Sequence, residues 1–107
     1  MRIDSAILIQ LTERCFDLSM DAGVPEPDRK EFMAMGKRLR GSLLNLLTAK
    51  FDEGTMIVTL ANTRMSEVNK KIKDITEVLA HTAQVIGQIG QVVSILDDLL
   101  KIAVNFV

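Results

Sequence analysis

The sequence predicts an all-α fold: a helical bundle of three or four helices with a long, heptad-patterned helix at its C-terminal end. Three observations lead to this prediction. Apolar residues recur at spacings of three and four over most of the chain, strand-like alternation is nearly absent, and both prolines lie in one short segment. A chain of 107 residues with 48% hydrophobic content can bury one core. We therefore expect a single domain spanning residues 1–107.

The first helix is predicted over residues 5–22. Asp4 or Ser5 can cap its N-terminus through a side-chain oxygen, and Gly23 stands just past its end, where a left-handed residue commonly closes a helix. The apolar stripe of this helix follows 3-4-3 spacing and comprises Leu8, Leu11, Cys15 and Leu18. This pattern favours Cys15 as a small buried hydrophobe over a reactive thiol.

The second helix is predicted over residues 29–52, after a loop at "VPEPD". Each proline fixes its own backbone and disfavours helix in the residue before it, so this loop is the clearest in the chain. Asp28 followed by Glu31 has the spacing of a capping box, and Gly54 is expected to stop or kink the helix. The predicted core stripe is Phe32, Met35, Leu39, Leu43 and Leu46.

The third helix is predicted over residues 56–107, although residues 56–61 are β-branched enough for a strand as well. From residue 65 onward a heptad seam of alternating three- and four-residue spacing comprises Met65, Val68, Ile72, Ile75, Leu79, Thr82, Ile86, Ile89, Val93, Leu96, Leu100, Ala103 and Val107. One unbroken helix over residues 65–107 would be about 64 Å long. Two interpretations stay open: a continuous helix, which we favour because the register does not slip, and a kink or hairpin at Gly87–Gly90.

The flanks of the seam favour a bundle over a two-stranded zipper. The g positions of the same register are also apolar, and they are Val78, Val85, Val92, Leu99 and Phe106. A helix that is apolar at a, d and g contacts two neighbouring helices. Among the most buried side chains we expect Leu39, Leu43, Ile75, Leu79, Ile86, Val93 and Leu96.

Residues 85–107 are apolar around most of the helix circumference, with Asp97, Asp98 and Lys101 marking a wet side. Soluble monomers rarely expose such a large apolar surface. We therefore expect a homo-oligomer, with a dimer favoured, or a bound partner helix. The predicted interface comprises Ile86, Ile89, Val92, Val93, Leu96, Leu99, Leu100, Ala103 and Phe106.

Residues that could carry chemistry are few. His81 shares a predicted helix face with Glu77 and Asp74, but one histidine and two acids are too few for a closed metal site. Adjacent acids such as Asp97 and Asp98 diverge by about 100° on a helix and cannot converge on one substrate atom. No catalytic or nucleotide-binding motif appears. We expect no enzyme activity, no cofactor and no metal.

The charge pattern gives weak indications about partners and location. The formal net charge is −1, so the whole chain creates no field that would attract nucleic acid, and no nucleic-acid partner is expected. Five cations, Arg29, Lys30, Lys37, Arg38 and Arg40, nevertheless fan around one side of the second helix. The start of the chain lacks the pattern of a signal peptide, which leads us to expect a cytoplasmic protein.

Three functional hypotheses follow, in order of preference. The first is a small helical module for protein–protein interaction or oligomerisation. The second is a membrane-active helical protein that exposes the apolar segment 85–107 to lipid. The third is a regulatory or nucleic-acid-linked protein that uses the basic face of residues 29–40.

Overall fold

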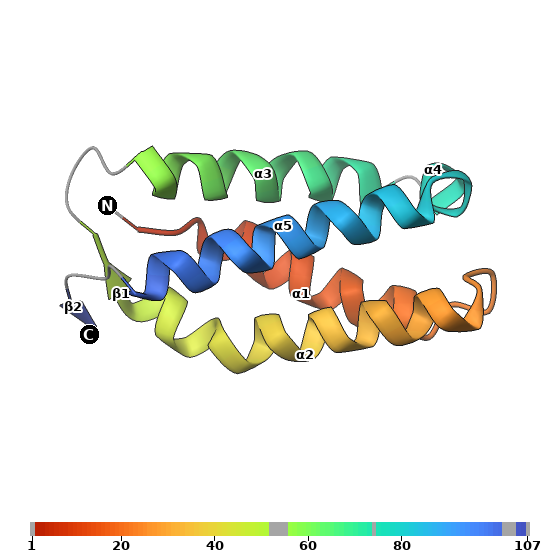
Figure 1. The fold of residues 1–107 in the computed structure, drawn as a ribbon, viewed down its shortest axis with the longest axis horizontal. Coiled ribbons are helices and arrows are strands. Elements are labelled where there is room, and N and C mark those ends of the chain that lie inside the picture. The colour runs from red at the N-terminus through yellow and green to blue at the C-terminus, as the bar shows by residue number, and fades with distance from the viewer. Residues whose placement is uncertain (1, 52–55, 74, 102–104, 107) are drawn as a thin grey trace.

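The computed structural model describes the backbone of residues 2–51, 56–73, 75–101 and 105–106, and the side chains of residues 2–51, 56–72 and 78–101. Its helices are α1 (Ser5–Ser19), α2 (Glu26–Thr48), α3 (Met56–Lys73), α4 (Ile75–Ala80) and α5 (Thr82–Lys101). Two short strands, β1 (Ala49–Lys50) and β2 (Asn105–Phe106), form an antiparallel pair. The helices pack against one another (Figure 1), which confirms the prediction of an all-α helical bundle.

The four long helices form two hairpins that pack against each other. α1 and α2 make the first antiparallel hairpin, and α3 and α5 make the second, with α4 at its turn (Figure 1). Between the hairpins α1 contacts α3 and α2 contacts α5, and the helices of each such pair run in the same direction (Figure 1). The order around the core is therefore α1, α2, α5, α3. The bundle measures 42 × 21 × 19 Å.

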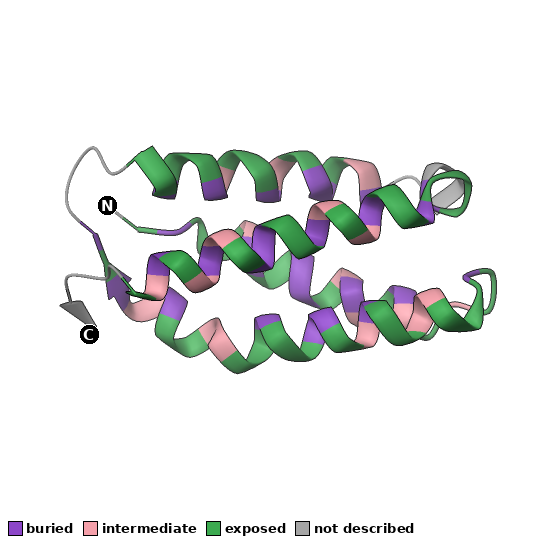
Figure 2. Ribbon diagram, in the orientation of Figure 1, coloured by how far each residue is buried: buried purple, intermediate pink, exposed green. Residues whose placement is uncertain are grey.

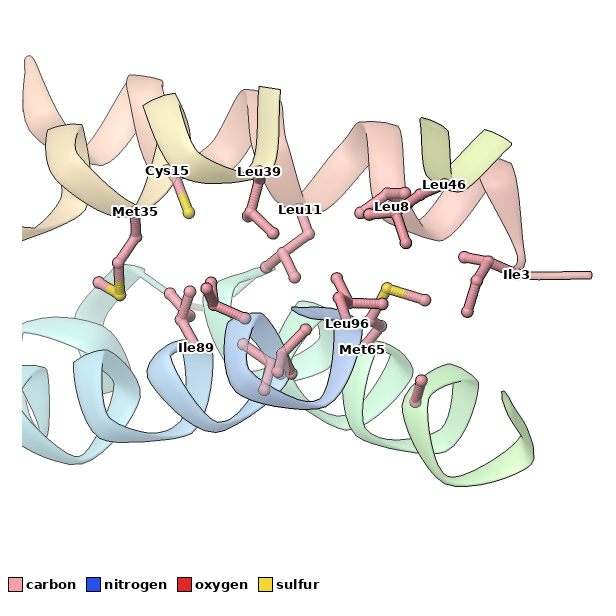
Figure 3. Packing of buried hydrophobic residues seen from close by; sticks show 14 of the residues in the cluster. Ile3, Leu8, Leu11, Cys15, Met35, Leu39, Leu46, Met65, Ile89 and Leu96 are labelled. Carbon is pink, nitrogen blue, oxygen red and sulfur yellow. The ribbon is translucent and has the colours of Figure 1, made fainter. Parts of the chain in front are cut away.

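The core lies in the space that the four long helices enclose. The buried positions of each helix follow its inward face (Figure 2). Leu11, Leu39, Met65 and Ile89 come from four different helices, belong to one apolar cluster (Figure 3), and are each at most 2% exposed. Burying a side chain of this size stabilises the fold by about 1.5–3 kcal/mol. Every long helix is therefore needed to complete the core.

The prediction of one helix over residues 56–107 is wrong, because the chain turns back between α3 and α5. The turn lies at α4 and His81, and Gly87–Gly90 lie inside α5. The backbone N–H of His81 and the hydroxyl of Thr82 both donate to the carbonyl of Val78, at 3.1 and 2.8 Å. Thr82, the one polar member of the seam, thus stands where α5 begins.

Length gives the physical reason for this turn. α1 and α2, with 15 and 23 residues, are about 23 and 35 Å long, too short to cover a helix of about 64 Å from the side. Folding the second half into a hairpin lets both of its limbs bury their stripes on the same core. The heptad register continued across the turn without slipping, so the seam alone did not reveal it.

Burial follows the prediction in the middle of the bundle and departs from it at the rim. Leu39, Val93 and Leu96 are buried, whereas Leu43 and Ile86 are only partly buried at the edge of the core. Leu79 is 43% exposed, because α4 is a single short turn at the end of the bundle. The side chain of Ile75 lies outside the described residues. The buried face of α5 is turned toward its g positions, with Val85, Val92 and Leu99 buried.

Helix α1 begins as predicted and ends earlier than predicted. The side chain of Asp4 accepts a hydrogen bond from the backbone N–H of Ile7 at 3.2 Å, which confirms it as the N-cap. The helix ends at Ser19, not at residue 22, and its C-cap is Met20, whose N–H donates to the carbonyl of Asp17, while the N–H of Asp21 donates to that of Leu18. Gly23 is therefore not the helix cap.

Helix α2 begins at Glu26, three residues before the predicted start, with Pro25 as its N-cap. The capping-box interpretation of Asp28 and Glu31 is wrong, because both residues lie inside the helix. Proline is tolerated in a first helical turn, where its missing N–H would have had no intrahelical partner. Pro27 accordingly sits inside α2, and only the first part of "VPEPD" is loop.

Helix α2 ends at Thr48, before the predicted residue 52, and the chain continues as β1. Ala49 pairs with Phe106 and Lys50 with Asn105, so an extended segment after α5 binds the connection between the two hairpins. Residues 56–60, for which helix and strand were both open, are the first turns of α3. Gly54, the predicted stop, lies outside the described residues.

Candidate functional site

The interface predicted on the last helix lies mostly inside the chain's own core. Its members Ile89, Val92, Val93, Leu96 and Leu99 are buried, and Ile86 and Leu100 are partly buried against the same cluster. Ala103 and the side chain of Phe106 lie outside the described residues. Up to Lys101, where the described side chains end, intrachain packing thus covers most of the apolar surface that suggested an oligomer. The oligomer itself stays a prediction.

Cys15 is buried in the core, as the spacing predicted. Desolvation by burial raises the pKa of its thiol from 9.0 to about 12. The thiolate is the nucleophile and the metal ligand, so the folded chain holds this sulfur in an inert form. Cys15 is therefore part of the packing between α1 and α2.

The surroundings of His81 do not form a metal site within the described residues. His81 is exposed at the bend between α4 and α5, while Asp74 and the side chain of Glu77 lie outside the described part of the chain. Among the side chains that are described, no three histidine, cysteine or acidic groups come together in a way that could hold a metal ion.

The five cations predicted to share a face of α2 diverge to two sides of this helix. Arg38 points toward α5, where its Nη2 lies 2.7 Å from Oδ2 of Asp97. Arg40 points toward α1, where its guanidinium carbon lies 5.2 Å from the ring centroid of Phe16. Lys30 lies 3.8 Å from Glu26 in an exposed pair along the helix, a type worth about 0.3–0.5 kcal/mol.

A second stripe on α2 carries the cations that turn toward α1. Lys30, Met33, Lys37, Arg40 and Leu44 follow 3-4-3-4 spacing, so they share one face of the helix. Two contacts place this face beside α1. Arg40 lies over Phe16, and Met33 lines a hollow of about 300 Å³ together with Ser19, which is also on α1.

Large apolar side chains are exposed on both helices along this seam. Leu44 of α2 is 72% exposed, Met20 at the end of α1 is 73% exposed, and Ile9 of α1 is 38% exposed. Met33 is half-buried between cations. We define the α1–α2 outer face by its apolar members and its cations: Ile9, Met20, Met33, Leu44, Arg29, Lys30, Lys37 and Arg40.

The sequence carries a signal for this face, although the predicted core stripe of α2 does not include it. The predicted stripe of α2 runs through Leu39, Leu43 and Leu46, which leaves Met33 and Leu44 about 100° or more away from it. Leu44 also follows Arg40 by four residues and Lys37 by seven, so it stands in a row of cations. An apolar residue in a charged row indicates surface contact more strongly than a charged row alone.

A different hollow, between α1 and α3, has acidic walls. It has a volume of about 510 Å³ and is lined by Gln10, Glu13, Arg14, Asp17, Leu18, Asp21 and Ile72. Arg14 is tied across it, because its Nη1 donates to the backbone carbonyl of Asn69 at 3.3 Å. The acids of α1 therefore lie toward α3, whereas the cations of the outer face lie between α1 and α2.

Exposed apolar residues also lie in the first turns of α3. Met56, Ile57 and Leu60 are 39–80% exposed, and they follow residues 52–55 directly, which lie outside the described part of the chain. The surroundings of this second patch are therefore only partly described. Both helices of the α1–α2 outer face, in contrast, are described in full.

The helices in the described ranges do not include one that is both long enough and apolar enough to cross a membrane. No protein-family model, curated protein or solved structure matches the chain. The function is therefore inferred from the surface of the chain itself.

Proposed function

We propose that this chain is a small helical module for protein–protein interaction that docks its partner on the α1–α2 outer face. The observation that carries the proposal is the exposure of Leu44 and Met20, each more than 70% open to solvent, beside a row of cations. Exposed apolar side chains that gather on one face and are rimmed by charge are typical of protein contact sites.

The close packing of the two helices supports this proposal. α1 and α2 approach closely at Gly36, where an added Cβ would lie 3.2 Å from the Cβ of Cys15 and from the ring of Phe16. The same ring lies beneath Arg40. A partner would therefore meet a preformed surface, and binding to a preformed surface avoids the entropy cost of ordering it.

The two alternative functions have less support. A membrane-active role for residues 85–107 would require Ile89, Leu96 and Leu99 to leave the core in which they are buried. Binding of nucleic acid through residues 29–40 would place phosphates beside Met33 and Leu44. The one aromatic residue among these cations, Phe32, is buried in the core, so bases could not stack on it.

Site-specific photo-crosslinking in cells that naturally contain the chain tests the proposed function. A photoreactive residue replaces Leu44, and a control variant carries it at Gln91, an exposed position of α5. We expect a discrete crosslinked protein from position 44 that position 91 does not give. Its yield should fall when Met20→Ser is added, because this change removes apolar surface from the face itself. Identical products from both positions, or none from position 44, would contradict the proposal.

A further inference from the structure

We infer, resting on the proposed function, that the partner presents an amphipathic helix whose apolar residues are separated by acidic ones. The inference depends on two properties of the α1–α2 outer face, its charge and its spacing.

The charge of this face is opposite to that of the chain as a whole. The face carries Arg29, Lys30, Lys37 and Arg40. The acids nearest to them are Glu26, which lines the same hollow, and Glu13, which stands four residues after Ile9, so four positive charges minus two give +2 on a chain of net charge −1. The acids of α1 lie in the hollow toward α3. A docked segment with carboxylates would therefore be attracted and oriented, while a basic one would be repelled.

One of these cations also has an unused donor. The Nε–H of Arg29 is buried beside the hollow that Met33 and Lys30 line, and it has no hydrogen-bond acceptor among the described residues. A buried donor without an acceptor is unfavourable, because it has lost its hydrogen bond to water. A carboxylate inserted into this hollow could satisfy it after a small rotation of the Arg29 side chain.

The apolar residues of the face form two groups at a helical spacing. Phe16 of α1 lies beside Gly36 and Arg40 of α2, and Ile9 and Met20 share its helix face at seven residues before and four after it. Because α1 and α2 are antiparallel, Ile9 should stand at the level of Leu44 and Met20 at the level of Met33. Ile9 and Met20 are eleven residues apart along α1, and Met33 and Leu44 are eleven residues apart along α2. This corresponds to a separation of about 16 Å along the helix axis. Lys37 and Arg40 lie between the two groups.

A helix laid along the seam would match this arrangement. It would place apolar residues about eleven positions apart, one in each group, because eleven residues are close to three full turns. Acidic residues four and seven positions from the apolar residue that contacts the Met33 group would face Lys37 and Arg40. This is helix-in-groove recognition, with charge selecting the partner.

A second copy of this chain fits the same face poorly. A two-fold axis through the α1–α2 outer face would bring its cations against the same cations of the other copy. Like charges in close contact are unfavourable across an interface. A two-fold pairing through this face is therefore disfavoured, and we assign the acidic helix to another protein.

A displayed library of helical peptides, randomised on one face and selected against the full chain, tests the inference. The expected winners have an excess of acidic over basic residues and two apolar positions about three turns apart. Their affinity should fall at least tenfold for Lys37→Glu and for Leu44→Ser. The matched controls Lys70→Glu and Met56→Ser, exposed on α3, should leave the affinity within twofold. Circular dichroism checks that all four variants fold.

Recovery of no helices, or of helices without acidic excess, would overturn the inference, and so would winners that bind Lys37→Glu as tightly as the original chain. Phosphatidylcholine vesicles with and without phosphatidylserine form a second arm of the test. Binding to the anionic vesicles that Lys37→Glu and Leu44→Ser abolish would assign the face to lipid instead. A specific crosslink from position 44, combined with neutral or basic winners, would leave the proposed function standing and reject the acidic helix alone.

Discussion

Burial alone sets the chemistry of Cys15. Its thiol lies between α1 and α2 without a charged partner, and desolvation raises its pKa from 9.0 to about 12. A raised pKa keeps the proton on the folded chain at pH values where the unfolded chain has already lost it. Stability and pH are therefore coupled at this residue.

We expect the free energy of unfolding to fall as the pH rises from 9 toward 12, because in this window the unfolded state binds fewer protons than the folded state. The stabilisation is fully present below pH 9. Urea denaturation at about pH 8 and about pH 10.5 should show a loss about 2 kcal/mol larger for the original chain than for Cys15→Ala. Effects of pH that the two chains share cancel in this comparison. An equal loss in the two chains would show that this thiol ionises normally when folded.

Two glycines of α2 should respond in opposite ways to the same change. A Cβ at Gly36 would lie 3.2 Å from Cys15 and Phe16, whereas a Cβ at Gly41 would have nothing within 4 Å. Alanine stabilises a helix interior by about 1 kcal/mol relative to glycine, but overpacking costs about 1–3 kcal/mol. Gly36→Ala should therefore destabilise the chain by about 1 kcal/mol and Gly41→Ala should stabilise it by up to about 1 kcal/mol. Thermal denaturation of both variants measures this, and stabilisation by Gly36→Ala would mean that the helices can move apart.

At the scale of the helices, the ends differ in how they are held. Asp4 caps α1 with its side chain, and its own N–H donates to Oδ1 of Asn62 on α3 at 2.8 Å. Helix α2 has no side-chain cap and starts on Pro25. The start of α1 is thus joined to the second hairpin, while the start of α2 depends on proline geometry.

Removal of the cap should be measurable. Asp4→Ala should lower the free energy of unfolding by about 1 kcal/mol, because the N–H of Ile7 loses its acceptor. Asp28→Ala, inside the first turn of α2, should lower it by only a few tenths of a kcal/mol, since it removes a favourable charge near the helix N-terminus and no cap. Chemical denaturation of the two variants compares them directly. A larger loss for Asp28→Ala would restore the capping-box interpretation.

Local patterns were sufficient to predict the helices, and insufficient to predict how they meet. Spacing predicted the inward faces of α1 and α2, including Cys15 and Leu39. The residue types at the start of α1 predicted a cap at Asp4 or Ser5, and the cap is Asp4. The turn before Thr82 could not be predicted, because it leaves the heptad register intact and contains neither glycine nor proline. The position of the α1–α2 outer face depends on which side of α2 is covered by α1. This is a property of the packing between helices, and the spacing within one helix does not determine it.

For the molecule as a whole, α5 completes a core that the other helices leave open. A chain that ends at Gln84 would lose Val85, Ile89, Val92, Leu96 and Leu99, all of them buried. We expect it to lose cooperative thermal unfolding and much of its helical circular dichroism, since the matching faces of α2 and α3 would be exposed to water. A chain that ends at Lys101 is the control and should keep a cooperative transition. An unchanged melting temperature for the shorter chain would show that α1, α2 and α3 fold without α5.

The arrangement of the hairpins also has a mechanical consequence. Helix α1 starts at the end of the bundle where α5 finishes, and the turns at residues 20–25 and at α4 lie at the opposite end (Figure 1). A force pulling Ile3 away from Lys101 would act across the helix axes and peel contacts apart one turn after another. A force between Asp21 and Lys101 would instead load the helices along their length, so that many contacts must slide together. The bundle should therefore yield to a weak pull in the first direction and resist a stronger one in the second.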